Sequence, residues 1–436
     1  MSDGVSRSRQ GGGRLRSRDP SVETPADPHP LRPTALEIAS GRMYGEHRES
    51  AELPTDSGNR ARSPLTVLED VLLPTLRRPP CLVSFSGGRD SSAVLAAAAR
   101  AARREGLPPP VPVTLRVRNA PMAEESRWQE RVVRHLGLRE WEVREAGEEL
   151  DRLGPLSVAV IRRHGVLYPP NTFLQVPLLE AARGGTLLSG FGGDELFTWW
   201  RWRYHADLFA RRRRPRPRDA LALALATTPA GVRGWWERRR SSWEELPWLR
   251  PNAVSMASRW YAAERARQPR SWSRWVGWFM RRRTVAAARW SLSLLASDAG
   301  TLLLHPLLDH AFVVAVAEAG GRFGFGDRTA AMRAIFADAL PDELLSRRTK
   351  ARYSEALWGR RAREFAEGWG GGGIDDELVN PEVLRNEWLR PLPHDDSAML
   401  MHAAWLSESA DGSPTGPPGH LAATAPGPGG IQPERS

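Results

Sequence analysis

The segment that begins at residue 81 joins an apolar run, a turn with two glycines and an alanine-rich tail. Cys81–Phe85 is apolar except at Ser84, residues 86–92 read SGGRDSS, and residues 93–99 favour a helix. This order predicts a buried strand, a turn and a helix. Backbone N–H groups at a helix start carry a partial positive charge, and glycine lets the chain approach an anion closely. The segment therefore predicts an anion pocket, unless it is an ordinary strand-to-helix turn.

Residues 86–92 resemble the SGGxDS loop of the N-type ATP pyrophosphatases, which split ATP between the α and β phosphates to adenylate a substrate. The chain has no GxxxxGK[ST] sequence, so a Walker A loop is excluded. The resemblance implies that Asp90 binds Mg²⁺, as a carboxylate can. It also implies that ATP is bound by Ser84, Ser86, Gly87, Gly88, Asp90, Ser91 and Ser92.

A second strand-turn-helix pattern follows at residues 186–197, TLLSGFGGDELF, which resembles the SGxGxDE loop of asparagine synthetases. Loops at the carboxyl ends of parallel strands can face one crevice. The resemblance implies that Asp90 and Asp194 are catalytic and share the Mg²⁺ and pyrophosphate. It also implies that Val117 and Gly190 line the adenine site with Ser84 and Ser86. The alternative is that Asp194 and Glu195 only cap the next helix.

Lys350 is the one lysine among 62 basic residues. Residues 340–353, LPDELLSRRTKARY, resemble the lysine-containing segment of asparagine synthetases and β-lactam synthetases. The resemblance implies that Lys350 contacts pyrophosphate and the adenylated intermediate, where a compact ammonium stabilises developing negative charge. A stray surface lysine is the alternative.

Phe191 and residues 198–200 depart from the asparagine-synthetase pattern. Phe191 stands where those enzymes carry glutamate and β-lactam synthetases carry tyrosine, so another group must accept the amine's proton, the amine must enter neutral, or the second half-reaction must differ. Residues 198–200 read TWW instead of continuing with glycines and tyrosine, which indicates an altered substrate side. His305 lies in a segment like the family's VPFLD, and we interpret it as a wall residue.

The cysteine content bears on the nitrogen source. Full-length asparagine synthetases begin with a glutaminase domain whose nucleophile is a cysteine at position two, where this chain has Ser2. Cys81 is the one cysteine and reads as a small hydrophobe on a strand, so a disulfide framework or a cysteine-rich zinc site is not expected. We therefore expect the nitrogen to come from free ammonia, from ammonia that a separate protein supplies, or from the amine of a substrate. A separate protein that delivers a peptide substrate is also possible.

Length and composition favour a soluble, cytoplasmic enzyme. The 436 residues are 41% hydrophobic and contain no apolar run of membrane-spanning length. Residues 1–60 are expected to be a largely disordered Arg/Pro-rich tail, and residues 409–436 a Gly/Pro-rich one. Neither has the apolar core of a signal peptide.

The middle of the chain divides into two parts. Residues 61–197 alternate strands with helices, with further strands at 111–117 and 141–143 and helices at 123–136 and 173–183, which predicts a doubly wound parallel α/β sheet. The resemblance implies the fold of the pyrophosphatase-loop (PP-loop, HUP-type) superfamily. Residues 198–408 read as an appended, mostly helical part that carries Lys350.

Residues 199–290 interleave arginine runs with tryptophans, and the chain has a formal charge of +11. Such a pattern can bind nucleic acid, and several pyrophosphatase-loop enzymes modify tRNA, so an RNA-modifying ligase is one alternative. Against it, Trp272, Trp275 and Trp278 have the spacing of a helix face that packs into a core.

The expected function is an ATP-dependent ligase that adenylates a carboxylate and transfers it to ammonia or an amine. The expected cofactors are ATP and Mg²⁺. A second possibility is a specialised synthetase of a ring, amide or peptide product, of the β-lactam synthetase or lasso-peptide cyclase kind. A third is a non-catalytic ATP-binding homologue.

Overall fold

A five-stranded, all-parallel sheet in the order β3-β2-β1-β4-β5 forms the centre of the computed structural model. The strands are β1 (Cys81–Ser84), β2 (Val111–Val117), β3 (Glu142–Ala146), β4 (Thr186–Leu188) and β5 (Leu302–Leu304). The structure describes residues 29–47, 62–118, 120–197, 200–216, 219, 228–229, 231–232, 235, 246–347, 349, 351 and 353–411. Strands β1 and β4 are neighbours, with Leu82 opposite Leu187. The two glycine loops therefore start side by side.

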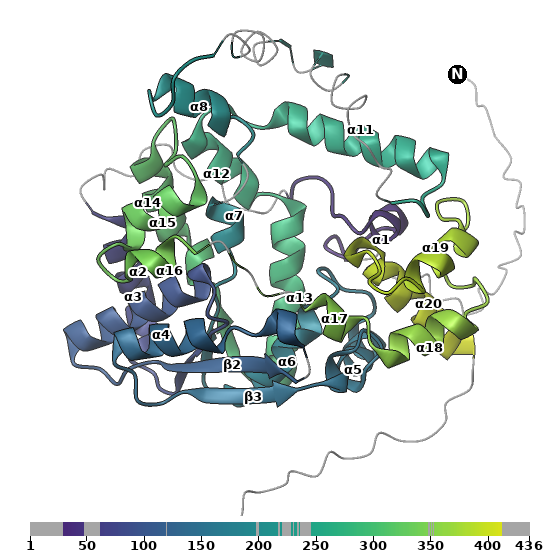
Figure 1. The fold of residues 1–436 in the computed structure, drawn as a ribbon, viewed down its shortest axis with the longest axis horizontal. Helices are drawn as coiled ribbons and strands as arrows, with labels where there is room; N and C mark the ends of the chain where they lie inside the picture. The colour runs from purple at the N-terminus through teal and green to yellow at the C-terminus, as the bar shows by residue number, and fades with distance from the viewer. Residues whose placement is uncertain are drawn as a thin grey trace, which may run out of the picture.

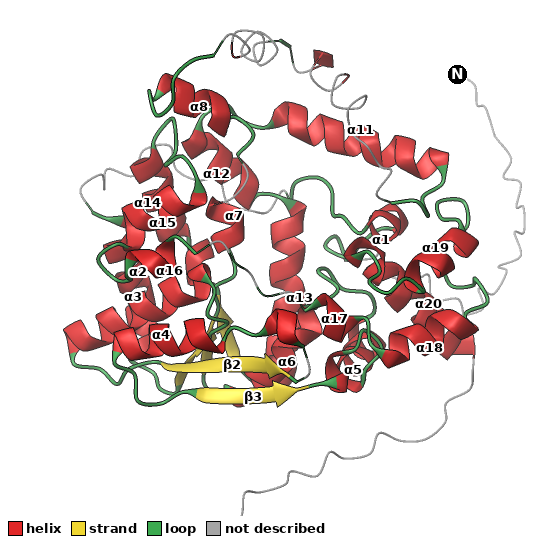
Figure 2. Ribbon diagram, in the orientation of Figure 1, coloured by secondary structure: helices red, strands yellow, loops and turns green. Residues whose placement is uncertain are grey.

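Helices cover both faces of the sheet, as the doubly wound prediction requires (Figures 1 and 2). Side chains alternate between the faces: Val83 joins the apolar cluster on one face and Leu82 the cluster on the other. The first face is covered by α2 (Pro64–Leu76), α3 (Arg89–Glu105), α4 (Ser126–Leu136), α12 (Trp272–Met280), α14 (His310–Gly320), α15 (Arg328–Phe336) and α16 (Asp342–Leu345). The second is covered by α5 (Pro155–His164), α6 (Val176–Ala181) and α13 (Arg283–Ala299).

A separate apolar cluster joins both ends of the described chain. It contains residues of α1 (Ala35–Ser40), α11 (Pro251–Arg267), α18 (Arg360–Gly368), α19 (Pro381–Trp388) and α20 (Ala398–Asp411). Figure 1 shows α1 beside α19 and α20.

Within the segment expected to be a largely disordered tail, residues 29–47 are folded and contain α1. Thr34 and Glu37 form a capping box at its start. Glu37 is 2% exposed and pairs with Arg283, and Trp248 Nε1 donates to the carbonyl of Ala39 over 2.8 Å. The composition of residues 1–60 gives no indication of these long-range contacts.

The remaining elements are short. They are α7 (Gly193–Phe197), α8 (Arg203–Phe209), α17 (Ser354–Leu357) and the 3-10 turns Pro121–Ala123, Glu148–Leu150, Thr172–Gln175, Pro306–Leu308 and Asp395–Ser397. The helix expected over 173–183 is one of these turns followed by α6. Strand β5 lies in the half expected to be helical, since a three-residue apolar run has no readable period.

The three tryptophans of α12 were predicted to pack into the core, and the structure tests this prediction. Trp272, Trp275 and Trp278 are 5%, 1% and 5% exposed and belong to the core on the first face. This confirms the core interpretation for them. Trp236 and Trp243 lie outside the described residues. None of the described helices combines the length and apolar character needed to cross a membrane.

Candidate active site

The first glycine loop (residues 84–91, which includes the start of α3) is held by hydrogen bonds that involve Ser86 and Ser91. Ser86 Oγ lies 3.1 Å from Ser91 Oγ and accepts from the N–H of Gly88 over 3.2 Å. Gly87 has a φ of +81°, a conformation that favours glycine. Gly88 precedes α3 without a side-chain cap, so the first-turn N–H groups of α3 are left for another acceptor.

The second glycine loop (residues 189–194, which includes the start of α7) lies directly against the first. A Cβ added to Gly190 would lie 2.7 Å from Ser91 N, and one added to Gly193 would lie 2.2 Å from Asp90 Cγ. Real Cβ atoms do not approach so closely, so only glycine allows this contact. The structure therefore brings Asp90 and Asp194 to one place, as the two motifs predict.

Arg328, at the start of α15, joins the two carboxylates. Its guanidinium donates one hydrogen bond to Asp194 Oδ1 and another to Asp90 Oδ2. Burial raises the pKa of Asp90, and the charge of Arg328 opposes this. The other oxygen of Asp90, Oδ1, is buried without a hydrogen-bond partner. Sequence reasoning missed Arg328, because no motif distinguishes it among so many arginines.

The segment around Lys350 is anchored by a buried ion pair with Glu125 and by a hydrogen bond to the first loop. Arg347 and Glu125 have side chains 4% and 5% exposed and are paired with each other. Arg347 also donates to the carbonyl of Gly87 over 2.8 Å, and the N–H of Ala351 donates to Glu125 over 2.9 Å. Lys350 itself lies outside the described residues. Its neighbours Thr349 and Ala351 line the cavity described next.

A cavity of about 500 Å³ opens between the two loops. Of the residues predicted from sequence, it is lined by Ser84, Ser86, Gly88, Asp90, Ser91, Gly190 and Asp194. Gly87, Ser92 and Val117 do not line it. Ser92 is 2% exposed, and Val117 ends β2 opposite Ala146. A role for Val117 beside adenine stays a prediction.

Phe191, in the second loop, and His305, after β5, form part of the cavity wall. Their rings meet edge to face with centroids 5.2 Å apart, and His305 Nδ1 lies 2.6 Å from Ser189 Oγ. Burial, with the nearby charge of Arg289, lowers the pKa of His305 to about 4, so the ring is neutral at neutral pH. The sequence interpretation of His305 as a wall residue agrees with this position.

Sequence reasoning missed several other lining residues because they come from distant elements. Glu125 precedes α4, Leu292 lies on α13, and Tyr353 follows the Lys350 segment. The signal available for Tyr353 was its place in the quoted 340–353 motif. Glu125 and Leu292 have no motif of their own.

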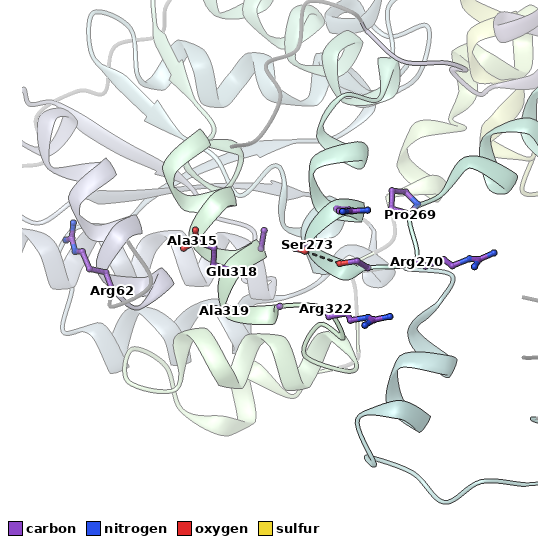
Figure 3. A pocket seen from close by; sticks show the side chains of 12 residues that line it. Arg62, Pro269, Arg270, Ser273, Ala315, Glu318, Ala319 and Arg322 are labelled. Atoms are coloured by element: carbon purple, nitrogen blue, oxygen red, sulfur yellow. Dashed lines mark hydrogen bonds between the residues drawn. The ribbon is translucent and has the colours of Figure 1, made fainter. Parts of the chain in front are cut away.

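A larger cavity, of about 1010 Å³, lies apart from both loops and contains none of these site residues (Figure 3). It is lined by Arg270, Arg274 and Arg322, with serines and alanines of α12 and α14 between them, and by Arg62, which lies apart from the others in the view. Arg62 is paired with Asp70. The pocket is basic but has no aromatic side chain among its lining residues.

Two glycine loops side by side at one edge of an all-parallel sheet are the arrangement that the resemblance to ATP pyrophosphatases implies. The asparagine synthase family model matches residues 74–409, and the chain belongs to that family. Membership supports an AMP-forming, ATP-dependent ligase that makes amide bonds. No curated protein matches the chain.

Proposed function

We propose that this chain adenylates a carboxylic acid and transfers the acyl group to an amine nitrogen. The observation that carries the proposal is the direct contact of the two glycine loops, with Gly190 against Ser91 and Gly193 against Asp90. This contact places two carboxylates and a guanidinium at one end of a cavity lined by the first loop. Such a site suits the pyrophosphate part of ATP.

The reaction proceeds in two displacements. A carboxylate oxygen attacks the α-phosphorus, the bond to the α-β bridging oxygen breaks, and pyrophosphate leaves with the electron pair. The amine nitrogen then attacks the acyl carbon, AMP leaves with the electrons of the broken C–O bond, and the nitrogen loses a proton. Phe191 cannot accept that proton, since its side chain has no polar atom.

Arg328 and the proposed Lys350 act on the pyrophosphate side. The guanidinium of Arg328 offsets the charge of Asp90 and Asp194 and offers donors to phosphate oxygens. Lys350 is proposed, from the family resemblance, to stabilise charge on departing pyrophosphate. Both ends of its segment are fixed near the cavity by Arg347 and Ala351.

Asp90 and Asp194 fit a role as Mg²⁺ ligands. The buried Oδ1 of Asp90 has no hydrogen-bond partner, so it can accept a cation. Among the described residues, no three His, Cys, Asp or Glu side chains converge on a metal-sized site. Two carboxylates suffice for Mg²⁺, which commonly completes its shell with substrate phosphates and water. The ion would supply charge neutralisation of the phosphates.

Two alternatives receive less support. A non-catalytic ATP-binding protein would not need two adjacent carboxylates that oppose the charge of the phosphates. An RNA-modifying ligase would use exposed aromatic side chains for base stacking. The tryptophans of α12 are buried, whereas Trp235 and Trp260 are 43% and 51% exposed, so the test below includes added RNA.

The test is an isotope experiment with the full chain, ATP, Mg²⁺, an amine and candidate acids labelled with ¹⁸O in the carboxylate. The proposal predicts AMP and pyrophosphate as products, with one ¹⁸O transferred to AMP. Formation of ADP and phosphate, or of AMP without label, would contradict it. A requirement for added RNA would favour the RNA-modifying alternative.

A further inference from the structure

The active-site cavity has a charged end and an uncharged end. Every charged side chain among its described lining residues comes from the side of the pyrophosphate-binding groups: Arg89, Asp90, Glu125, Asp194 and Arg328. They stand on, or directly before, α3, α4, α7 and α15, which group together in Figure 1.

Each of these charged side chains already has a partner, which is another lining residue, Arg347, or a group on α15 or α16. Arg328 bridges Asp90 and Asp194, and Glu125 pairs with Arg347. Arg89 donates to Thr329 Oγ1 over 3.2 Å and to the carbonyl of Leu345 over 3.4 Å. None of these contacts reaches toward β5.

The opposite end, which we call the apolar end, is built by different elements. Its side chains are Leu174, Phe191, Ala288, Leu292 and Leu303, contributed by the turn before α6, the second loop, α13 and β5. The other side chains there are neutral polar groups: Asn171, Thr172, Gln175, Ser189 and His305. The Nε2 of His305 has no hydrogen-bond partner among the described residues. With the imidazole neutral, no charged side chain among the described residues lines this end at neutral pH, and Arg289 acts on His305 from outside the cavity.

The sheet order indicates whether ATP or the acid substrate faces the apolar end. Strand β4 separates β1, which leads into the first loop, from β5, which leads to His305. The two glycine loops follow β1 and β4, which are neighbours in the sheet. The space beside them along the sheet edge is therefore on the β5 side. An acid that attacks the α-phosphorus must point its body away from the pyrophosphate, and the apolar end lies in that direction.

Resting on the function proposed above, we propose that the acid substrate carries an uncharged, mainly apolar body, aliphatic or aromatic, and is not aspartate. Beyond its reacting carboxylate, aspartate has an ammonium and a second carboxylate. Burying those charges against side chains that carry no opposite charge is strongly unfavourable. An apolar body instead gains from burial against leucine and phenylalanine side chains.

The test measures binding, so that it does not depend on turnover. Calorimetry with the full chain would compare three stable acyl-adenylate mimics: sulfamoyladenosine without an acyl group, its hexanoyl derivative and its β-aspartyl derivative. We expect the hexanoyl compound to bind at least tenfold more tightly than either of the others. Equal or tighter binding of the aspartyl compound, or no gain from the hexanoyl group, would overturn the inference.

A variant pair locates the effect. Leu303→Glu places a charge at the apolar end and should remove the hexanoyl preference while leaving binding of sulfamoyladenosine unchanged. Leu302→Glu is the control, because Leu302 is the adjacent residue on β5, does not line this cavity and is 56% exposed. A hexanoyl preference that survives Leu303→Glu would count against the assignment.

The same titrations separate this inference from the proposed function. If ATP and all three mimics fail to bind the wild-type chain, the nucleotide pocket itself is wrong and the inference falls with it. If ATP and sulfamoyladenosine bind but the hexanoyl group adds nothing, only the substrate class is wrong.

Discussion

Gly193 packs against the side chain of Asp90 so closely that an added Cβ would lie 2.2 Å from Asp90 Cγ. The glycine is therefore required by the contact between the two loops. A methyl group at this position must push the loops apart or turn the carboxylate away.

Gly193→Ala should lower acid-dependent exchange of labelled pyrophosphate into ATP by about 10²-fold, since ångström-scale displacement of a reacting group costs about that much. Gly370→Ala is the matched control, because a Cβ at Gly370 meets nothing within 4 Å. Wild-type exchange in Gly193→Ala would show that the observed contact is not needed.

Arg328→Ala should reduce the same exchange by about 10²–10³-fold, the usual effect of removing one charge-stabilising donor. Arg328→Lys should restore only part of it, because an ammonium lacks the planar fork that serves two carboxylates. Arg333 lies on the same helix as Arg328 and forms an exposed ion pair with Asp342 of α16. Arg333→Ala should therefore leave exchange near wild type. Equal loss in both alanine variants would point to damage to α15 itself.

Glu125→Gln should destabilise the fold by about 3–5 kcal/mol, because it leaves Arg347 buried without a countercharge. Glu343→Gln breaks an exposed pair with Arg131 and should change stability by less than about 1 kcal/mol. Denaturant titration of both variants measures the difference. Similar denaturation midpoints for the two variants would show that the buried pair contributes no more to stability than the exposed pair.

The neutral state of His305 predicts a pH dependence of stability. Its folded pKa, about 4, lies below the ordinary value of 6.5, so the unfolded chain binds the proton more readily. The stabilising contribution is present above pH 6.5 and is lost as the pH falls toward 4. His305→Asn should flatten the fall in melting temperature over this range. His310→Asn, at an exposed histidine, should follow the wild type.

The sequence was most informative where chemistry requires local patterns. The two glycine loops, their strands and the positions of Asp90 and Asp194 were all predicted, because strand, turn and helix are encoded within a dozen residues. Cys81 was correctly placed on a buried strand, and burial raises its pKa to about 12.

Long-range relationships could not be predicted in this way. Arg328 reaches Asp90 across 238 positions of sequence, and one arginine among many carries no mark of such a role. The three leucines of β5 have no period, so their place beside β4 depends on tertiary pairing. The folding of residues 29–47 depends on the pair between Glu37 and Arg283, which also joins distant segments.

The most direct test of the central claim, that the two loops form one ATP site, is pyrophosphate exchange in Asp90→Asn and Asp194→Asn beside the wild-type chain. With an acid that supports exchange in the wild type, both variants should lose it while keeping the wild-type melting temperature within a few degrees. Exchange that persists at the wild-type rate in either variant would contradict the account.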